Sequence, residues 1–347
     1  MKAQQSIENQ SPGSRLPLLL IPALALTLVC LLLLVLGLSP LTIGRALASG
    51  SVGNWLKFSH VLSVWSPLLL CSCGLLFTFR AGLWNIGIEG QVILGAICCT
   101  AVLRLPGGLL PPPAVLTLAL LAGGAGGGLW GILAGELRNR GGVNEIFGGL
   151  GLNFVGQGLV IWLIFGPWKR AGIASMSGTD LLPPHFWLQS PPGWRVAPVA
   201  LALAVLTLAA SILLLDRTRF GLRLRAAGTS PGAARLFGIE PDRISLQAMF
   251  LAGLLAGLAG GLQVTAVYHR LIPAISSGYG YLALLVVMLA NYRPLAVPLI
   301  ALFFACLVTG SIQLPISLQI DSSLAGVIQG ACVLSALLVY GLRKEKS

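Results

Sequence analysis

The sequence predicts an all-α polytopic membrane protein with about ten transmembrane helices. Of its 347 residues, 56% are hydrophobic and only 9% are charged, against roughly 25% charged in an ordinary soluble domain. Several separate apolar runs reach or approach the roughly 20 residues that a helix needs to cross a bilayer. These runs are continuous, whereas the strands of a membrane barrel would show short alternating segments. A water-soluble globular protein is therefore excluded.

The apolar runs divide the chain into ten predicted spans. A polar tail, 1–15, precedes the first run, 16–38, which is longer than the roughly 7–15 residues of a signal-peptide core, so we expect a retained helix. A polar loop is expected at 39–57. The other spans are predicted at about 58–79, 82–103, 114–135, 143–167, 196–215, 244–267, 281–292, 295–314 and 322–342. The run 281–292 is too short to cross alone and is predicted to be a half-helix that starts in the preceding Gly-Tyr-Gly. The transmembrane domain is thus 16–342, followed by a tail, 343–347.

The distribution of Lys and Arg supports this count. With a cytoplasmic N-terminus, the inside segments hold 15 of the 22 basic residues and the outside segments hold 7, which follows the positive-inside rule. Both termini are then predicted to be cytoplasmic. The net charge of +12 is explained by these loops and by their contact with anionic membrane lipid. We therefore expect no nucleic-acid binding.

Ten helices would form two five-helix halves of opposite orientation, the arrangement of an inverted repeat. Glycines recur every four residues on two of the spans, and such ridges let helices approach closely within lipid. The ridges are Gly123, Gly127, Gly131 and Gly135 on one span, and Gly253, Gly257 and Gly261 on the other. Helix packing is the expected role of these glycines, and the repeat is a hypothesis.

The third predicted span opens with polar residues. Asn85, Glu89 and Gln91 precede an apolar run, and a carboxylate in hydrocarbon costs at least roughly 2.5–3.5 kcal/mol. On a helix, Asn85 and Glu89 would share one face. Two interpretations remain open: these groups line a solute path, which we favour, or they form a polar clamp between two helices.

The loop 216–243 carries the signature of a short helix. Ser230 is a suitable N-cap before Pro231, and Gly238 fits the position just past a helix end. The helix predicted at 232–237 presents Ala233, Ala234, Leu236 and Phe237. A helix resting on lipid headgroups is the alternative, but such helices favour bulky apolar residues. The small side chains favour docking into a partner's groove.

Three motifs resemble those of a known family. They are Asn-Ile-Gly-x-Glu-Gly-Gln at 85–91, Val-Asn-Glu-Ile at 143–146 with a downstream Asn153, and Phe-Gly-x-x-x-Arg-Ala-x-Gly followed by Ala-Ala-Arg-x-x-Gly-Ile at 220–239. About residues 55–342 resemble the membrane permease subunit of an ATP-binding-cassette (ABC) importer in the branched-chain amino acid/simple sugar permease superfamily. The first motif places the resemblance in the nucleoside-type branch.

The resemblance implies a function, a location and a set of partners. It implies a multi-pass subunit of the bacterial cytoplasmic (inner) membrane that works with a cytoplasmic P-loop ATPase, a second related permease and an extracytoplasmic solute-binding protein. A heterodimer of permeases is expected. The residues expected to line or support the solute path are Asn85, Glu89, Gln91, Asn144, Glu145 and Asn153. Those expected to dock the ATPase are Ser230, Ala233, Ala234, Arg235, Leu236, Phe237 and Gly238.

The residues agree that energy must come from another chain. No lysine lies in a Gly-x-x-x-x-Gly-Lys-Ser/Thr sequence, which a P-loop requires. ATP and magnesium are therefore expected on the partner ATPase, with no cofactor in this chain. No hydrolase motif is present either, so we expect no enzyme activity. The loop 168–195, rich in Trp and Pro, is expected to dock the solute-binding protein or to be a solvated linker.

The favoured hypothesis is a permease that carries nucleosides, or related ribose-containing or simple-sugar solutes, inward by alternating access. The alternative is a stand-alone secondary transporter that uses intramembrane carboxylates to couple protons or sodium. The scarcity of such carboxylates and the predicted docking helix argue against it. A membrane scaffold or receptor would leave the polar groups near 85–91 and 144–153 unexplained.

Overall fold

The computed structural model describes residues 39–105, 111–170 and 177–319, with isolated residues between 27 and 37 and between 326 and 331. The predicted spans 16–38 and 322–342 and both tails thus lie almost entirely outside the described residues. Within the described part, all regular elements are helices. Six of them are long and apolar enough to cross a membrane, and two apolar helices are shorter. The chain is a multi-pass helical membrane protein.

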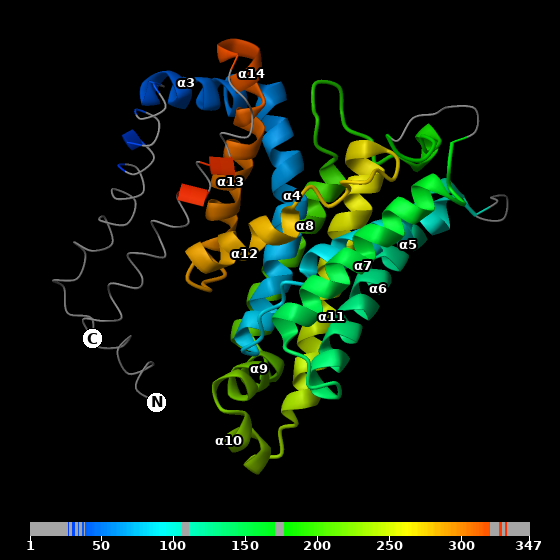
Figure 1. Cartoon of the computed structure of the whole chain (residues 1–347), viewed down its shortest axis with the longest axis vertical. Coiled ribbons are helices and arrows are strands. Elements are labelled where there is room, and N and C mark those ends of the chain that lie inside the picture. The colour runs from blue at the N-terminus through cyan, green and yellow to red at the C-terminus, as the bar shows by residue number, and fades with distance from the viewer. Residues whose placement is uncertain are drawn as a thin grey trace. The chain divides into compact units, whose positions relative to one another are not determined.

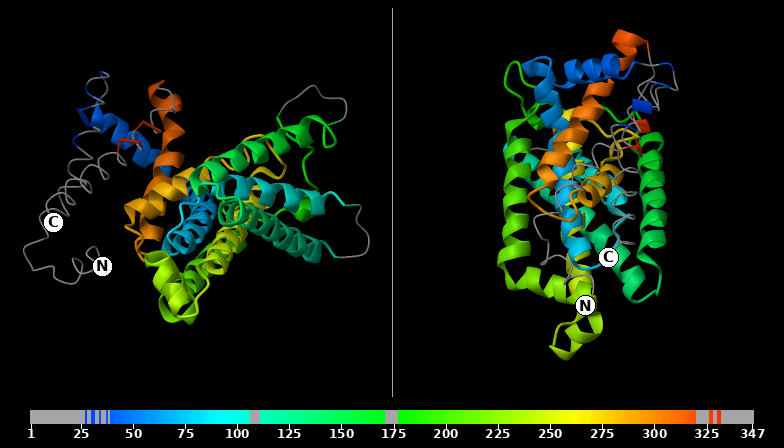
Figure 2. Two further views of the ribbon diagram at one scale, coloured as in Figure 1. Left: turned by 60° about the horizontal axis from the view of Figure 1, so that its bottom comes forward. Right: turned by 90° about the vertical axis from the view of Figure 1, so that its left-hand side faces the viewer.

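Residues 55–305 form one compact unit, and its first part contains four helices (Figure 1). They are α4 (Trp55–Arg80), α5 (Ile88–Leu103), α6 (Pro112–Asn139) and α7 (Glu145–Phe165). Helix α4 is the most enclosed of the long apolar helices, with 83% of its most apolar window buried. Figure 2 shows α5, α6 and α7 side by side on one flank of α4, and α5 packs on both α6 and α7.

The later helices of this unit vary more in length and type. They are η2 (Pro184–Phe186), α8 (Pro198–Arg217), α9 (Arg219–Thr229), α10 (Pro231–Leu236), α11 (Pro241–Leu262), the π-helical η3 (Gln263–Tyr268) and α12 (Tyr279–Leu289). Helix α13 (Val297–Ser311) begins here. Figure 1 shows α9 at one end of the unit and α10 beyond it.

The described residues before 55 and after 305 belong to a second unit. It contains α3 (Pro40–Ser51), the end of α13 and α14 (Gln313–Leu318). The prediction of a polar loop at 39–57 was wrong over most of its length. Pro40 occupies the first helical turn of α3, and the small residue Gly50 lets this helix approach α13, because a Cβ there would lie 2.8 Å from the carbonyl oxygen of Gly310.

The two glycine ridges face each other in the contact between α6 and α11. A Cβ on Gly127 would overlap the carbonyl oxygen of Gly253, and a Cβ on Gly257 would overlap that of Gly123. Helix α5 joins the same contact through Gly95, which lies against Gly257. The ends of the ridges meet other groups: Gly131 faces the Met249 carbonyl, Gly135 faces the Leu246 side chain, and Gly261 faces that of Leu120. Three helices thereby pack backbone to backbone.

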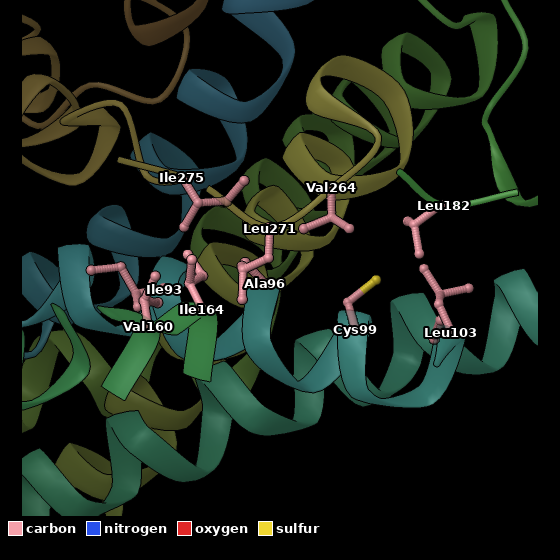
Figure 3. Packing of buried hydrophobic residues seen from close by; sticks show 11 residues of the cluster. Ile93, Ala96, Cys99, Leu103, Val160, Ile164, Leu182, Val264, Leu271 and Ile275 are labelled. Carbon is pink, nitrogen blue, oxygen red and sulfur yellow. The ribbon is translucent and has the colours of Figure 1, made fainter. Parts of the chain in front are cut away.

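Residues 269–278 leave η3 as an irregular segment that packs onto α5 and α7. Figure 3 shows Leu271 and Ile275 among buried apolar side chains of those helices, including Ile93 and Val160. The described part of loop 168–195 pairs with the same segment: the amide of Thr179 donates to the carbonyl of Leu271 over 2.9 Å. The loop is therefore attached to the segment 269–278 at this point.

Candidate functional site

The polar residues of the 85–91 motif lie at the turn that joins α4 to α5. Helix α5 begins at Ile88, so Asn85 precedes it, and the prediction that Asn85 and Glu89 share a helix face was wrong. The chain turns because the Leu83 amide donates back to the Thr78 carbonyl over 2.9 Å. This turn folds the Asn85 side chain over the first turn of α5.

Asn85 and Gln91 form a reciprocal amide pair. The Nδ2 atom of Asn85 donates to Oε1 of Gln91 over 3.2 Å, and Nε2 of Gln91 donates to Oδ1 of Asn85 over 3.1 Å. Both side chains are buried. Each group thus supplies the hydrogen bonds that the other would otherwise lack in an apolar environment.

Asn153 of α7 joins this turn to two other elements. Its Oδ1 accepts from the Gly90 amide over 2.8 Å, and its Nδ2 donates to the Ile86 carbonyl over 3.0 Å. The same Nδ2 donates to the hydroxyl of Tyr281 on α12 over 3.1 Å. Helix α7 comes this close because a glycine, Gly149, lies against the turn: a Cβ there would be 2.6 Å from the backbone nitrogen of Gly87.

Glu89 binds the first turn of α12. Its Oε2 accepts from the Gly280 amide over 2.7 Å, and the Ser276 hydroxyl and the amides of Gly278 and Tyr281 are further polar neighbours. Glu89 is 6% exposed, and it forms no ion pair with Lys or Arg in the described part of the chain. Its carboxyl group accepts instead from a backbone N–H group at the N-terminus of a helix. We call Asn85, Glu89, Gln91 and Asn153 the polar cluster.

Helix α12 is a half-helix, as the sequence predicts. It begins within the Gly-Tyr-Gly sequence and has 11 residues, so it is about 16 Å long, against roughly 30 Å of hydrocarbon. The segment before it turns sharply at Gly278, whose φ of 71° is in the left-handed region. Irregular backbone at membrane depth is tolerated only where protein or a water-filled cavity surrounds it. The polar cluster supplies part of that surrounding.

Asn144 and Glu145 occupy a different place. The side chain of Asn144 caps α7 by accepting from the Ile146 amide over 2.9 Å. Glu145 forms an ion pair with Arg138 of α6, with 3.3 Å between Nε and Oε2. No hydrogen bond links either side chain to the polar cluster among those that the structure describes. Their positions are those of groups that fix the turn between α6 and α7.

The segment 216–243 contains two helices, of which the sequence predicts only the second. In α10, the Ser230 hydroxyl accepts from the Ala233 amide over 3.4 Å, and Gly238 follows the helix with a φ of 73°. The side chains of Leu236 and Phe237 are 88% and 84% exposed. The neighbouring residues differ in environment: Ala233 is exposed, Ala234 is buried, and Arg235 pairs with Asp242 at 3.4 Å.

Helix α9 connects this segment to the turn before the polar cluster. A Cβ on Gly228, near the end of α9, would lie 2.7 Å from the carbonyl carbon of Ala81. An ion pair joins the same regions, with Nη2 of Arg80 2.7 Å from Oδ1 of Asp216. The backbone that carries Asn85 and Glu89 is therefore in direct contact with the helix that precedes α10.

Sequence reasoning missed the α12 side of the site. Tyr281 holds Asn153 through its hydroxyl while its side chain is 41% exposed, and Gln157 of α7 donates to the carbonyl of Pro273 over 2.8 Å. The one available signal was a polar Tyr in an apolar run after Gly-Tyr-Gly. These two contacts span 128 and 116 positions of the chain, and no local sequence pattern reveals them.

Comparison with known proteins gives a family match. Residues 58–337 match the model of the branched-chain amino acid transport system permease component. The chain is 31% identical to a glucose ABC transporter permease of Haloferax volcanii over 77% of this chain and 72% of the relative. It is 26% identical to the guanosine ABC transporter permease NupP of Bacillus subtilis over 95% and 96% of the two chains. A second guanosine permease of that organism, NupQ, is 29% identical over 69% and 76%.

Proposed function

The chain belongs to the family of permease components of branched-chain amino acid transport systems, whose relatives here are ABC importer permeases, and we propose that it imports nucleosides or related sugars. The solute class includes ribose-containing compounds and simple sugars. Transport is inward, by alternating access, and is driven by ATP hydrolysis in a separate P-loop ATPase. This chain holds the solute path and performs no catalysis of its own.

The observation that carries this proposal is the attachment of a half-helix to the polar cluster. Solute sites in membrane transporters are commonly built at discontinuous helices, whose ends offer unpaired backbone groups at membrane depth. Here Glu89 and Asn153 hold the start of α12. The cluster therefore braces the path, and Tyr281, being partly exposed, offers an aromatic face and a hydroxyl to a solute. An aromatic face can stack on a nucleobase, and a hydroxyl can pair with ribose or sugar hydroxyls.

The proposed topology has ten spans in two inverted halves with both termini in the cytoplasm, in the bacterial inner membrane. The excess of basic residues in the segments assigned inside supports this orientation. On that topology α9 and α10 are cytoplasmic. A second permease completes the importer, in keeping with the pair of guanosine permeases found among the relatives. The loop 168–195 faces outward and receives the solute-binding protein.

The ATPase docks on α10. Leu236 and Phe237 are large apolar side chains that protrude at the far end of the unit, and such residues act as anchors at protein interfaces. Motion of α10 reaches the polar cluster through α9, because Gly228 of α9 contacts the turn that carries Asn85. The ion pair between Asp216 of α8 and Arg80 at the end of α4 supports the same coupling. Ala234 is buried and supports the α10 fold.

The test uses tagged full-length chain recovered from membranes together with its partners. Leu236→Arg and Phe237→Arg are expected to abolish recovery of the ATPase while the second permease is retained. Leu222→Arg, at another exposed leucine on α9, is the matched control and keeps both partners. ATP-dependent uptake of labelled guanosine and of labelled glucose then assigns the solute. Uptake that persists without ATP and collapses with the proton gradient would contradict the proposal and identify a secondary transporter.

A further inference from the structure

A lateral groove in the unit 55–305 is not used by the proposed transport path. It has a volume of about 600 Å³, within the range of about 300–1,000 Å³ that is usual for ligand sites. Its walls come from Ile132 of α6, Leu214 at the end of α8, Phe220 at the start of α9, and Leu246 and Phe250 of α11. The amide of Gln247 is its polar contribution.

The groove is nearly all apolar, and it lies at one end of the bundle. Leu214 and Phe220 bracket the junction of α8 and α9, and Leu246 is in the second turn of α11. On the proposed topology this junction is at the cytoplasmic membrane surface. The floor of the groove is fixed, since the Phe250 ring fills the space beside Gly128, where a Cβ would lie 2.6 Å from Cε2 of the ring. An apolar groove at the cytoplasmic membrane surface matches a lipid acyl chain in shape and polarity.

The edge of the groove is strongly basic. Arg217 and Arg219 lie three and one positions before Phe220 in the chain, and both are exposed. Neither forms an ion pair in the described part of the chain, because the adjacent carboxylate of Asp216 is already bound to Arg80 at 2.7 Å. Arg223 and Arg225 extend the same positive charge along α9. An apolar groove beside unpaired arginines is complementary to an anionic amphiphile.

We propose that the groove binds an anionic phospholipid of the cytoplasmic leaflet, with one acyl chain between α8 and α11 and its phosphate on Arg217 and Arg219. Each basic residue near an anionic membrane surface strengthens binding of an anionic lipid by about fivefold. The lipid would bind against Phe220 of α9, the helix that touches the turn before the polar cluster. Occupancy would then hold α9 at the membrane surface.

The experiment measures lipid retention by native mass spectrometry of the purified transporter complex. The probes are phosphatidylglycerol, phosphatidylcholine of the same chain length, and free glycerol phosphate. The expected result is retention of phosphatidylglycerol by the wild type. Arg217→Ala combined with Arg219→Ala should weaken the binding of phosphatidylglycerol roughly thirtyfold. Leu246→Trp should also weaken this binding, because the larger side chain fills the groove. The matched control, Arg140→Ala with Arg243→Ala, also removes two exposed arginines from the proposed cytoplasmic side and should bind like the wild type.

Three outcomes would overturn the proposal. Equal retention of phosphatidylcholine would show that the arginines do not recognise the headgroup. Binding of glycerol phosphate as strong as that of the lipid would show an anion site without a chain site. Retention by the isolated chain but not by the assembled complex would show that the second permease covers the groove. All three readouts are independent of transport, so failure of the proposed solute leaves this test intact.

Discussion

Helices α6 and α11 touch through glycine backbones over successive turns, whereas the start of α12 is held by side chains from two distant parts of the chain. The first contact depends on shape, since its central glycines face a carbonyl group or a second glycine. The second depends on hydrogen bonds from Glu89 and Asn153. Close packing leaves no room for an alternative arrangement, but hydrogen bonds can be exchanged for others. A rigid frame and a releasable half-helix are what a transporter that alternates between two states requires.

The contact between α6 and α11 should be the most sensitive part of the molecule. Gly127→Leu is expected to destabilise the protein by about 3 kcal/mol, the upper end of the usual cost of overpacking, because the added side chain would overlap the Gly253 carbonyl and must push the helices apart. Folded protein in detergent, measured by size-exclusion chromatography and thermal unfolding, is expected to be lost. Gly158→Leu on α7 is the control, since a Cβ at that position would have no atom within 4 Å. Equal loss in both variants would contradict the role assigned to the ridge.

The attachment of α12 should affect transport more than folding. Glu89→Ala removes the acceptor for the Gly280 amide, and a buried donor left without its acceptor costs about 1–3 kcal/mol. Uptake is expected to fall at least about tenfold, while protein level and recovery of the ATPase are retained. Glu89→Gln keeps an acceptor oxygen and should recover part of the uptake. Uptake in Glu89→Ala equal to that of the wild type would exclude this carboxylate from the transport cycle.

The amide pair offers a finer measurement of the same region. Asn85→Leu and Gln91→Met each leave the partner amide buried without its hydrogen bonds, at a cost of about 1–3 kcal/mol. The double variant replaces both partners with apolar groups of similar shape and should be less destabilised than the sum of the single variants. A double-mutant cycle on thermal unfolding is expected to give a coupling free energy of about 1 kcal/mol. Additive effects would show that the two amides do not interact.

The sequence predicts the frame better than the site, and the reason is physical. Glycines every four residues and apolar runs are local patterns, and they place the ridges and most helix ends within a few residues of the structure. The N-cap at Ser230 is equally local. The helical prediction for Asn85 fails because the turn before α5 is stabilised by Gln91 and by residues of α4. Likewise, Glu89 meets Gly280 across 191 positions, a contact that only the packed fold can create.

The stability of the irregular segment before α12 should also depend on pH, and this is the smallest of the four expected effects. The His269 ring stacks on Trp187 with 4.0 Å between centroids, and its Nδ1 lies 3.1 Å from the Thr265 carbonyl. Burial lowers the pKa of His269 below its usual value of about 6.5. The unfolded chain therefore binds a proton before the folded chain does, so stability is unchanged at higher pH and decreases as the pH falls through about 6.5. Thermal unfolding between about pH 5 and 8 should show this decrease in the wild type and a smaller one in His269→Gln.

Since this segment leads into α12 and not into the glycine ridges, hydrogen exchange at low pH should increase at 269–280 while the amides of α6 and α11 stay protected. Equal loss of protection in both regions would contradict the division between a rigid frame and a releasable half-helix.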